Sequence, residues 1–262
     1  MTPRLVASDL DGTLVRSDGS VSARTRDAVA AVEKAGGLFV MVTGRPPRWM
    51  AQVADQTGHR GLAVCANGAL VYDLHTEQVV RANVLAAEAA GQVVAALREA
   101  LPGISFAVER GAGGFAREEA YVPRFDNEAP MHGAPVEQLL EEGVVKLLAR
   151  HEGLGSDELL LQARARVGAL AECTHSSLDG LLEISATGVS KASGLAALAT
   201  DWGVDAAQVV AFGDMPNDLP MLAWAGHSVG MANAHPDVLA AVDEVTASND
   251  EDGVAQVLDR WF

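Results

Sequence analysis

The chain has 262 residues, 49% of them hydrophobic, and its 35 acidic against 19 basic side chains give a formal net charge of −16. A surface this acidic repels nucleic acid and anionic membranes, which argues against either as a partner. The apolar stretches are short, and none approaches the roughly 20 residues that cross a bilayer. No leader segment is apparent before the first strand, so we expect a cytoplasmic protein, either a monomer or a homodimer.

Five short apolar runs each end in a small polar residue or a turn. Continuous apolar runs of this kind are typical of strands that are buried on both faces of a parallel sheet. Helical patterns separate them, and Ser22 is the expected N-cap of the first helix. The runs cover residues 5–7, 38–42, 62–65, 209–212 and 228–231, and the helical patterns cover 22–35, 47–57, 190–202 and 217–225. This alternation predicts a doubly wound α/β core with a Rossmann-like parallel sheet.

The middle of the chain has a different pattern, with more glycine and acidic residues and with short or amphipathic strands. Helices are expected over 86–101 and 157–168, and strands over 105–108, 144–149 and 181–184. We therefore predict a core domain formed by residues 1–83 and 186–262, and a smaller inserted α+β domain formed by residues 84–185. The two cysteines, Cys65 and Cys173, lie in apparent strands, so we expect buried thiols rather than a disulfide or a zinc site.

The first apolar run is followed directly by Asp9-Leu10-Asp11-Gly12-Thr13. Two carboxylates two positions apart at a strand end face the same region. One carboxylate could attack phosphorus as a nucleophile, and the other could hold the proton that a leaving oxygen needs. Crowded negative charges favour protonation of one carboxylate unless a metal ion neutralises the other. Asp-Gly is also common turn chemistry, so this segment alone leaves a plain turn open.

Polar groups also follow two later segments. The second run ends at Thr43, Gly44 and Arg45, which offer a hydroxyl donor, a backbone that allows close approach, and a guanidinium. Lys191 stands near a predicted helix start, where an ordinary surface lysine is the alternative. Asn67 ends the third run, where it either touches a substrate or only forms a hairpin turn. Carboxyl ends of parallel strands share one edge of the sheet, so Thr43 and Asn67 are expected to converge with Asp9 and with Asp214, which follows the fourth run.

The fourth apolar run closes with Asp214, Asn217 and Asp218, whose oxygen atoms suit a hard cation. Taken in order, the four segments resemble the haloacid dehalogenase-like superfamily, whose pattern is Asp-x-Asp, Ser/Thr, Lys and Gly-Asp-x-x-x-Asp. Their particular forms look like the Cof-like, sugar-phosphatase branch of that superfamily. In that branch a cap domain is inserted between the Thr and Lys motifs, at the same place as the inserted domain predicted from the residue pattern.

The resemblance assigns roles to the matched residues. Asp9 would be the nucleophile and a ligand of magnesium (Mg²⁺), and Asp11 the general acid and base, with its carbonyl oxygen also on the metal. Thr43 and Lys191 would hold the phosphoryl oxygens, and Asp214 would be the third protein ligand of the metal.

Four further residues complete the site that the resemblance implies. Asp218 would support the metal ligands from behind, and substrate contacts are expected from Gly44, Arg45 and Asn217. One position departs from the branch, because Ala192 stands where a glycine usually follows the lysine. The glycine-rich, acidic segment 110–119 does not allow specificity residues to be carried over into the cap.

The expected function is hydrolysis of a small phosphomonoester, such as a sugar phosphate or a related metabolite, through an aspartyl-phosphate. A phosphomutase shares the same motifs, and the sequence leaves this alternative open. A non-catalytic phosphosugar-binding module would require a broken motif, and all four are intact. A dehalogenase is disfavoured, because its chemistry needs neither a metal nor an acid at the position of Asp11. Discrimination among leaving groups is expected to come from the cap.

Overall fold

The computed structural model describes residues 2–111, 114–124, 133–141 and 143–262. Positions 112–113 of the glycine-rich segment therefore lie outside the described residues. The contacts divide the chain into two compact units, one formed by residues 1–81 and 190–262 and the other by residues 82–189. Their limits lie close to the boundaries expected at 84 and 185. The assignment of the inserted unit as a cap stays a prediction.

The first unit is built on an eight-stranded sheet in the order β13-β12-β11-β1-β2-β3-β4-β5. Neighbouring strands from β13 to β3 run parallel, and β4 is antiparallel to β3. The strands are β1 (Leu5–Ser8), β2 (Leu38–Val42), β3 (Leu62–Cys65), β4 (Leu70–Asp73), β5 (Gln78–Ala82), β11 (Val209–Gly213), β12 (His227–Gly230) and β13 (Glu244–Val245). The predicted α/β class with a parallel core is confirmed.

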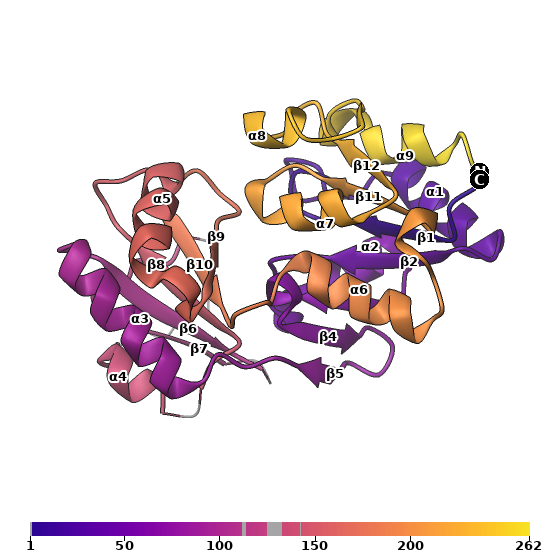
Figure 1. Cartoon of the computed structure of the whole chain (residues 1–262). Helices are drawn as coiled ribbons and strands as arrows, with labels where there is room; N and C mark the ends of the chain where they lie inside the picture. Colours follow the sequence, from indigo (N-terminus) through magenta and orange to yellow (C-terminus); the bar gives the residue numbers. More distant parts are fainter. Residues whose placement is uncertain (1, 112–113, 125–132, 142) are drawn as a thin grey trace. The chain divides into compact units, whose positions relative to one another are not determined.

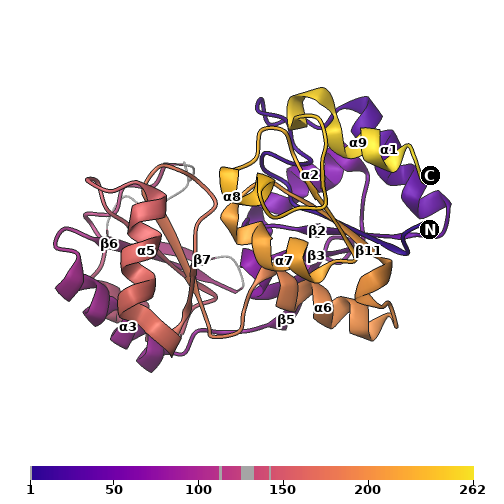
Figure 2. The same ribbon diagram turned by 45° about the horizontal axis from the view of Figure 1, so that its top comes forward.

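Helices cover both faces of this sheet. Helix α1 packs against α2 and α9 on one face, and α6 packs against α7 on the other (Figures 1 and 2). The helices are α1 (Ala23–Lys34), α2 (Met50–Thr57), α6 (Lys191–Asp201), α7 (Leu219–Trp224), α8 (Pro236–Leu239) and α9 (Gly253–Leu258). Ser22 caps α1 as expected, because its side chain accepts a hydrogen bond from the N–H of Thr25. The central strands are almost fully buried, as their continuous apolar runs require.

The second unit is a five-stranded antiparallel sheet in the order β7-β6-β8-β10-β9 with helices beside it. Its elements are α3 (Ala87–Ala100), β6 (Ser105–Arg110), β7 (Gly114–Arg117), α4 (Val136–Leu139), β8 (Lys146–Arg150), α5 (Ser156–Val167), β9 (Glu172–Thr174) and β10 (Leu181–Ser185). Helices α3 and α5 enclose an apolar core with alternate side chains of the strands. The unit therefore has a core of its own.

The alternate residues of the same strands carry buried charges. Lys146 donates a hydrogen bond to Glu183 over 2.5 Å, and Arg150 lies next to Tyr121, with its guanidinium 5.9 Å from the ring centre. Burial raises the pKa of Tyr121 to about 12, although Arg150 acts to lower it. Both cysteines are thiols that are buried in strands, as expected. No helix in the described part of the chain is both long and apolar enough to cross a membrane.

Candidate active site

Four neighbouring strands of the first unit bring polar residues to one edge of the sheet. The strands lie in the order β11-β1-β2-β3 and run parallel, so their carboxyl ends meet at the same edge. Asp214, Asp9 and Thr43 follow the first three strands directly, and Asn67 follows the fourth within two residues. In open α/β sheets this edge is where ligands bind. The four strand ends that carry these residues therefore lie side by side, as expected.

Lys191 joins two of the carboxylates. Its ammonium donates hydrogen bonds to Asp9 Oδ1 over 2.6 Å and to Asp218 Oδ1 over 2.5 Å. The side chains of Lys191 and Asp218 are fully buried, and that of Asp9 is 7% exposed. Ser190 caps helix α6, so Lys191 is its first residue and is held at the helix start. Lys191 is thus no ordinary surface lysine, in spite of the alanine that follows it.

Asp214 completes a group of three carboxylates. Ligand oxygens of Asp9, Asp214 and Asp218 all lie within 4.8 Å of one another. Thr13 donates a hydrogen bond from Oγ1 to Asp214 Oδ1 over 2.9 Å. Asp218 Oδ2 accepts from the backbone N–H groups of Asp214 and Met215, both over 3.0 Å. Both oxygens of Asp218 are therefore engaged by protein donors, which favours a supporting role for it.

The protonation behaviour of the group follows from its burial. Burial raises the pKa of Asp9 well above its ordinary value, and the charge of Asp218 adds to this against the opposing effect of Lys191. Burial, followed by Asp218, raises the pKa of Asp214 to about 7. Burial alone would lower the pKa of Lys191, but Asp218 and Asp9 outweigh it, so the pKa is raised and the ammonium stays charged. The single positive charge of Lys191 cannot neutralise three buried carboxylates.

Asp11 and Arg45 form a second pair. Arg45 donates from Nε to Asp11 Oδ2 over 2.8 Å and from Nη2 to Asp11 Oδ1 over 2.5 Å. The Asp11 side chain is 63% exposed, whereas that of Arg45 is only 17% exposed. Thr43 is buried, and its Oγ1 accepts from the N–H of Arg45 over 3.0 Å. The Asp11 carboxylate thus lies in a more open setting than Asp9, next to a fixed guanidinium.

Asn217 contacts Asn67 rather than any of the carboxylates already described. Its Nδ2 donates to Asn67 Oδ1 over 3.1 Å, and both side chains are buried. Asn67 is indeed in a turn that leads from β3 into the antiparallel β4, so the hairpin interpretation is correct. The contact with Asn217 adds a link to the site that the hairpin interpretation does not contain.

Two contributions to the site were not predicted from the sequence. Thr13 stands within the Asp9 motif without a predicted role, and its position four residues after Asp9 is the only local signal. Gly12 has φ +79°, and a Cβ there would lie 2.2 Å from Asp214 Oδ2. Only glycine therefore allows this close approach of the Asp9 loop to Asp214.

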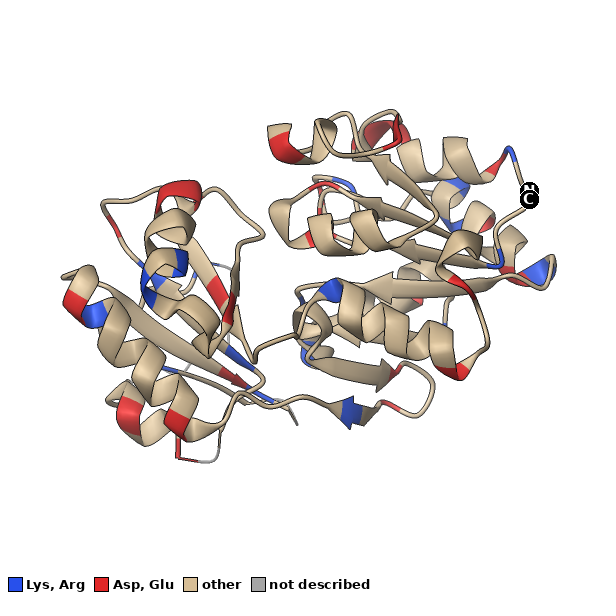
Figure 3. Ribbon diagram, viewed as in Figure 1, with Lys and Arg blue, Asp and Glu red and all other residues tan. Residues whose placement is uncertain are grey.

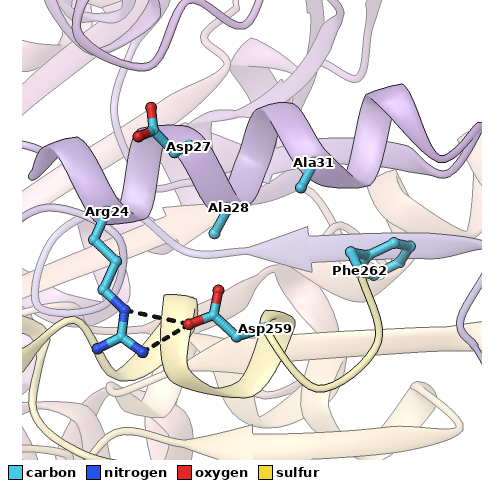
Figure 4. Close-up of a pocket in the computed structure, with 6 residues that line it drawn as sticks. All are labelled: Arg24, Asp27, Ala28, Ala31, Asp259 and Phe262. Atoms are coloured by element: carbon cyan, nitrogen blue, oxygen red, sulfur yellow. Dashed lines mark hydrogen bonds and ion pairs between the residues drawn. The ribbon is translucent and has the colours of Figure 1, made fainter.

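Arg48 and a surface hollow are two further features of the first unit. Arg48 lies over the ring of Trp49, with its guanidinium 4.9 Å from the ring centre. A surface hollow between α1 and the end of the chain contains the ion pair of Arg24 and Asp259, which are 2.7 Å apart (Figure 4). Its lining includes none of the residues of the carboxylate cluster, so it has no part in the chemistry of that cluster.

Comparison with known proteins places this geometry in a family. The family model described as haloacid dehalogenase-like hydrolase matches residues 6–258. The putative phosphatase YxeH of Bacillus subtilis is 28% identical, with 97% of each chain covered. The pyridoxal phosphate phosphatase YbhA of Escherichia coli is 29% identical, with 98% of each chain covered.

Solved structures agree with this assignment. The crystal structure of a haloacid dehalogenase-like hydrolase from Bacteroides thetaiotaomicron matches with a TM-score of 0.79 and 26% identity, over 99% of this chain and 100% of that one. The match extends over both units, so the inserted segment belongs to the shared fold. The chain belongs to the haloacid dehalogenase-like hydrolase family and is one of its phosphatases.

Proposed function

We propose that the protein is a magnesium-dependent phosphatase that hydrolyses a small phosphomonoester through an aspartyl-phosphate on Asp9. The observation that carries this proposal is the buried group in which Lys191 contacts Asp9 and Asp218, with Asp214 within 4.8 Å of both carboxylates. A buried carboxylate beside a fixed ammonium is suited to attack a phosphoryl group whose oxygens the ammonium also stabilises.

The chemistry of these side chains fits a divalent cation. Three buried carboxylates are accompanied by one ammonium, and burial, together with the charge of Asp218, raises the pKa values of Asp9 and Asp214. Magnesium prefers oxygen ligands and takes one or two carboxylates together with substrate phosphate and water. Asp9, Asp214 and the backbone carbonyl of Asp11 would hold it. When bound, it would neutralise charge on the carboxylates and on the phosphoryl oxygens.

The first half of the reaction transfers the phosphoryl group to the protein. A carboxylate oxygen of Asp9 forms a bond to phosphorus, while the bond between phosphorus and the leaving oxygen breaks. Asp11, in its protonated form, gives its proton to that oxygen, so an alcohol leaves. Lys191 and the hydroxyl of Thr43 would stabilise the charge on the equatorial phosphoryl oxygens. Gly44, Arg45 and Asn217 would position the substrate beside them.

The second half regenerates Asp9. Asp11 is now a carboxylate and takes a proton from a water molecule, whose oxygen bonds to phosphorus. The bond from phosphorus to Asp9 breaks, and inorganic phosphate leaves. Asp11 thereby recovers the proton it gave in the first half, so no proton is gained or lost over the cycle. A phosphomutase would instead return the phosphoryl group to a second hydroxyl of the substrate, and product analysis separates the two outcomes.

A small phosphorylated metabolite is the substrate class we propose, with a sugar phosphate as the leading candidate. The Escherichia coli relative is named for pyridoxal phosphate, which is also a small phosphomonoester. A panel of metabolite phosphomonoesters, assayed for inorganic phosphate with and without magnesium, would identify the substrate. The cytoplasmic location and the oligomeric state expected from the sequence stay predictions.

The decisive test replaces the nucleophile. Asp9→Asn is nearly isosteric but cannot form an acyl phosphate, so turnover should fall by several powers of ten, to below about a hundredth of the wild-type rate. Acid quench of the wild-type enzyme with a ³²P-labelled substrate should trap label on Asp9. Asp55→Asn, an equal charge change at a side chain that is 73% exposed on α2, should retain full activity. A labelled Asp9→Asn enzyme, or more than about a hundredth of the activity, would refute the assignment.

A further inference from the structure

The turn at the end of β3 has an unusual backbone. Ala66, Asn67 and Gly68 have φ values of 51°, 56° and 99°, so three consecutive residues are in the left-handed region. Alanine is rarely found there, asparagine is found there more readily, and a run of three such residues persists only where the surrounding structure holds it. The contacts of the turn should therefore show what it is built to hold.

On one side the turn is bonded to the loop that carries Thr43. The N–H of Ala66 donates to the carbonyl of Arg45 over 3.0 Å, and the N–H of Asn67 donates to the carbonyl of Thr43 over 3.0 Å. These two bonds require both N–H groups to point back toward β2, which the left-handed backbone allows. The turn thus fixes the main chain of the Thr43 loop.

On its other side the turn lies against the helix that begins with Lys191. A Cβ on Gly68 would lie 1.9 Å from the carbonyl oxygen of Ser190 and 3.3 Å from the backbone nitrogen of Lys191. A Cβ on Gly194, one turn into the helix, would lie 3.0 Å from Cα of Gly68. Backbone therefore packs directly on backbone here, and the position of Lys191 depends on the turn.

The side chain of Asn67 makes the third link. It accepts a hydrogen bond from Asn217, which directly precedes Asp218, the carboxylate that contacts Lys191. The remaining amide atoms of this pair, Asn67 Nδ2 and Asn217 Oδ1, are buried and have no hydrogen-bond partner among the described residues. Unpaired buried amide atoms are unfavourable and uncommon, so their retention calls for an explanation.

We propose that Asn67 is a positioning residue of the phosphoryl-transfer site. Its side chain fixes Asn217, and its turn fixes the backbone at Thr43 and Lys191, so one short segment sets the spacing of the three motifs. This inference rests on the proposed function, because it concerns side chains proposed to hold the phosphoryl group. No motif of the family resemblance contains Asn67, and the sequence alone left its role open.

A double-mutant cycle tests the link between the two amides. The measured quantity is the single-turnover rate of phosphorylation of Asp9 in Asn67→Gly, Asn217→Ala and the double variant. Glycine keeps the left-handed backbone and removes only the side chain. Misplacement of reacting groups by a fraction of an ångström to an ångström should slow each single variant by on the order of tenfold to a hundredfold. The double variant should be no slower than the slower single variant, since both changes remove the same contact.

A matched control separates positioning from stability. Ser228 on β12 is also buried, and its Oγ donates a hydrogen bond to Asp243 Oδ2 over 2.8 Å. Ser228→Ala should lower the melting temperature yet leave the phosphorylation rate within about twofold of wild type. If Asn67→Gly is unfolded at the assay temperature, the whole cycle is measured at a lower temperature at which all three variants are folded.

The outcomes are distinct. A wild-type rate in the Asn67 variant, or losses that multiply in the double variant, would overturn the positioning role. A wild-type protein that neither releases phosphate nor carries label on Asp9 would instead refute the proposed function. Slower phosphorylation that is shared by the two single variants and absent from Ser228→Ala supports the inference.

Discussion

At the scale of single residues, the site is organised around a shortage of positive charge. Lys191 supplies one charge to a group in which Asp9, Asp214 and Asp218 could supply three negative ones. A divalent cation would bring the formal charge of these four side chains to zero. Binding of a proton is the other way to reduce the excess negative charge, and the raised pKa of Asp214 shows that this carboxylate binds a proton more readily than usual.

This competition between proton and metal predicts a pH-dependent effect of magnesium on stability. Burial raises the pKa of Asp214 from 3.8 to about 7, so the metal-free folded state holds a proton that the unfolded state has lost. The contribution of Asp214 to the free energy of unfolding is therefore complete at pH values below its unfolded-state pKa of 3.8. It is lost as pH rises through its folded-state pKa of about 7. Magnesium must displace that proton at low pH but meets a carboxylate at high pH.

Thermal melts check the prediction. Magnesium should raise the melting temperature by about several degrees at pH 8, and by about one degree or less at pH 5.5. Asp214→Asn should abolish most of the gain at pH 8, because it removes both a ligand and the titrating group. Equal gains at the two pH values in the wild-type protein would argue against metal binding at this carboxylate.

The role of Asp11 predicts a dependence on the leaving group. A sugar alkoxide must be protonated as it leaves, whereas p-nitrophenolate departs as an anion. Asp11→Ala should therefore reduce single-turnover phosphorylation of Asp9 by a factor on the order of a hundred with an alkyl phosphate, and far less with p-nitrophenyl phosphate. The nitrophenyl substrate should give a burst and then stall with phosphate on Asp9. Equal losses with both substrates would remove Asp11 from the acid role.

Most of the candidate site could be predicted from the sequence because its residues stand in local motifs. Asp9, Asp214 and Lys191 each follow a recognisable strand end or helix start. The contacts of Thr13 and Asn67 could not be predicted, because their partners are Asp214 and Asn217. Each of these pairs is separated by 150 residues or more. Such pairings depend on the order of strands in the sheet, which residue patterns do not state.

At the scale of elements, strands buried on both faces were predicted well and edge strands were not. The continuous apolar runs of β1, β2, β3 and β11 identify them directly. Strand β5 (Gln78–Ala82) is mostly exposed, and β13 (Glu244–Val245) has two residues, so neither has an apolar run to detect. The helices expected from 47 and 217 each begin with a 3₁₀ turn that contains a proline, so α2 starts at Met50 and α7 at Leu219.

The packing of the β3 turn on α6 gives a prediction at this scale. In Gly68→Ala the new Cβ would meet the Ser190 carbonyl, so the start of α6 must move, and with it Lys191. Phosphorylation of Asp9 should slow by on the order of a hundredfold. Gly58→Ala is the matched control, because Gly58 has φ +74° but no described heavy atom lies within 4 Å of a Cβ there.

Both glycine variants impose left-handed strain on alanine, at a cost of about 1–2 kcal/mol. Only Gly68→Ala adds the contact with α6. Melting temperatures should therefore fall in both variants, while the phosphorylation rate should fall in Gly68→Ala alone. Similar rates in the two variants would show that the close contact at Gly68 does not set the position of Lys191.

At the scale of the whole molecule, acidic residues are spread along the ribbons of both units (Figure 3). The net charge of −16 follows directly from the sequence, and so does its repulsion of other anions. The separate core of the inserted unit could also be expected, because its residue pattern differs from that of the flanking segments. Its strand order could not, since β6, β8 and β10 pair across long stretches of chain.

The overall charge predicts how salt affects the capture of substrate. With magnesium bound, and before Asp11 takes up the proton that it gives to the leaving oxygen, the carboxylates of Asp9, Asp11, Asp214 and Asp218 are balanced by Lys191, Arg45 and the metal, so the site is locally neutral. The net charge of −16 then governs the approach of a dianionic phosphomonoester at low salt, where the Debye length is about 30 Å at 0.01 M. Near 0.1 M it is about 10 Å, and most of that repulsion is screened.

Raising sodium chloride from about 0.01 to about 0.1 M at saturating magnesium should therefore increase kcat/KM, by about two- to fivefold, and leave kcat nearly unchanged. If a cationic site attracted the anionic substrate, kcat/KM would instead fall as salt is added. A phosphomonoester whose leaving group carries an ammonium has a smaller net charge, so its kcat/KM should respond less. If kcat/KM falls with salt for the dianionic substrate, the cations at the site outweigh the acidic surface, and the field at the site is set locally by Lys191, Arg45 and magnesium.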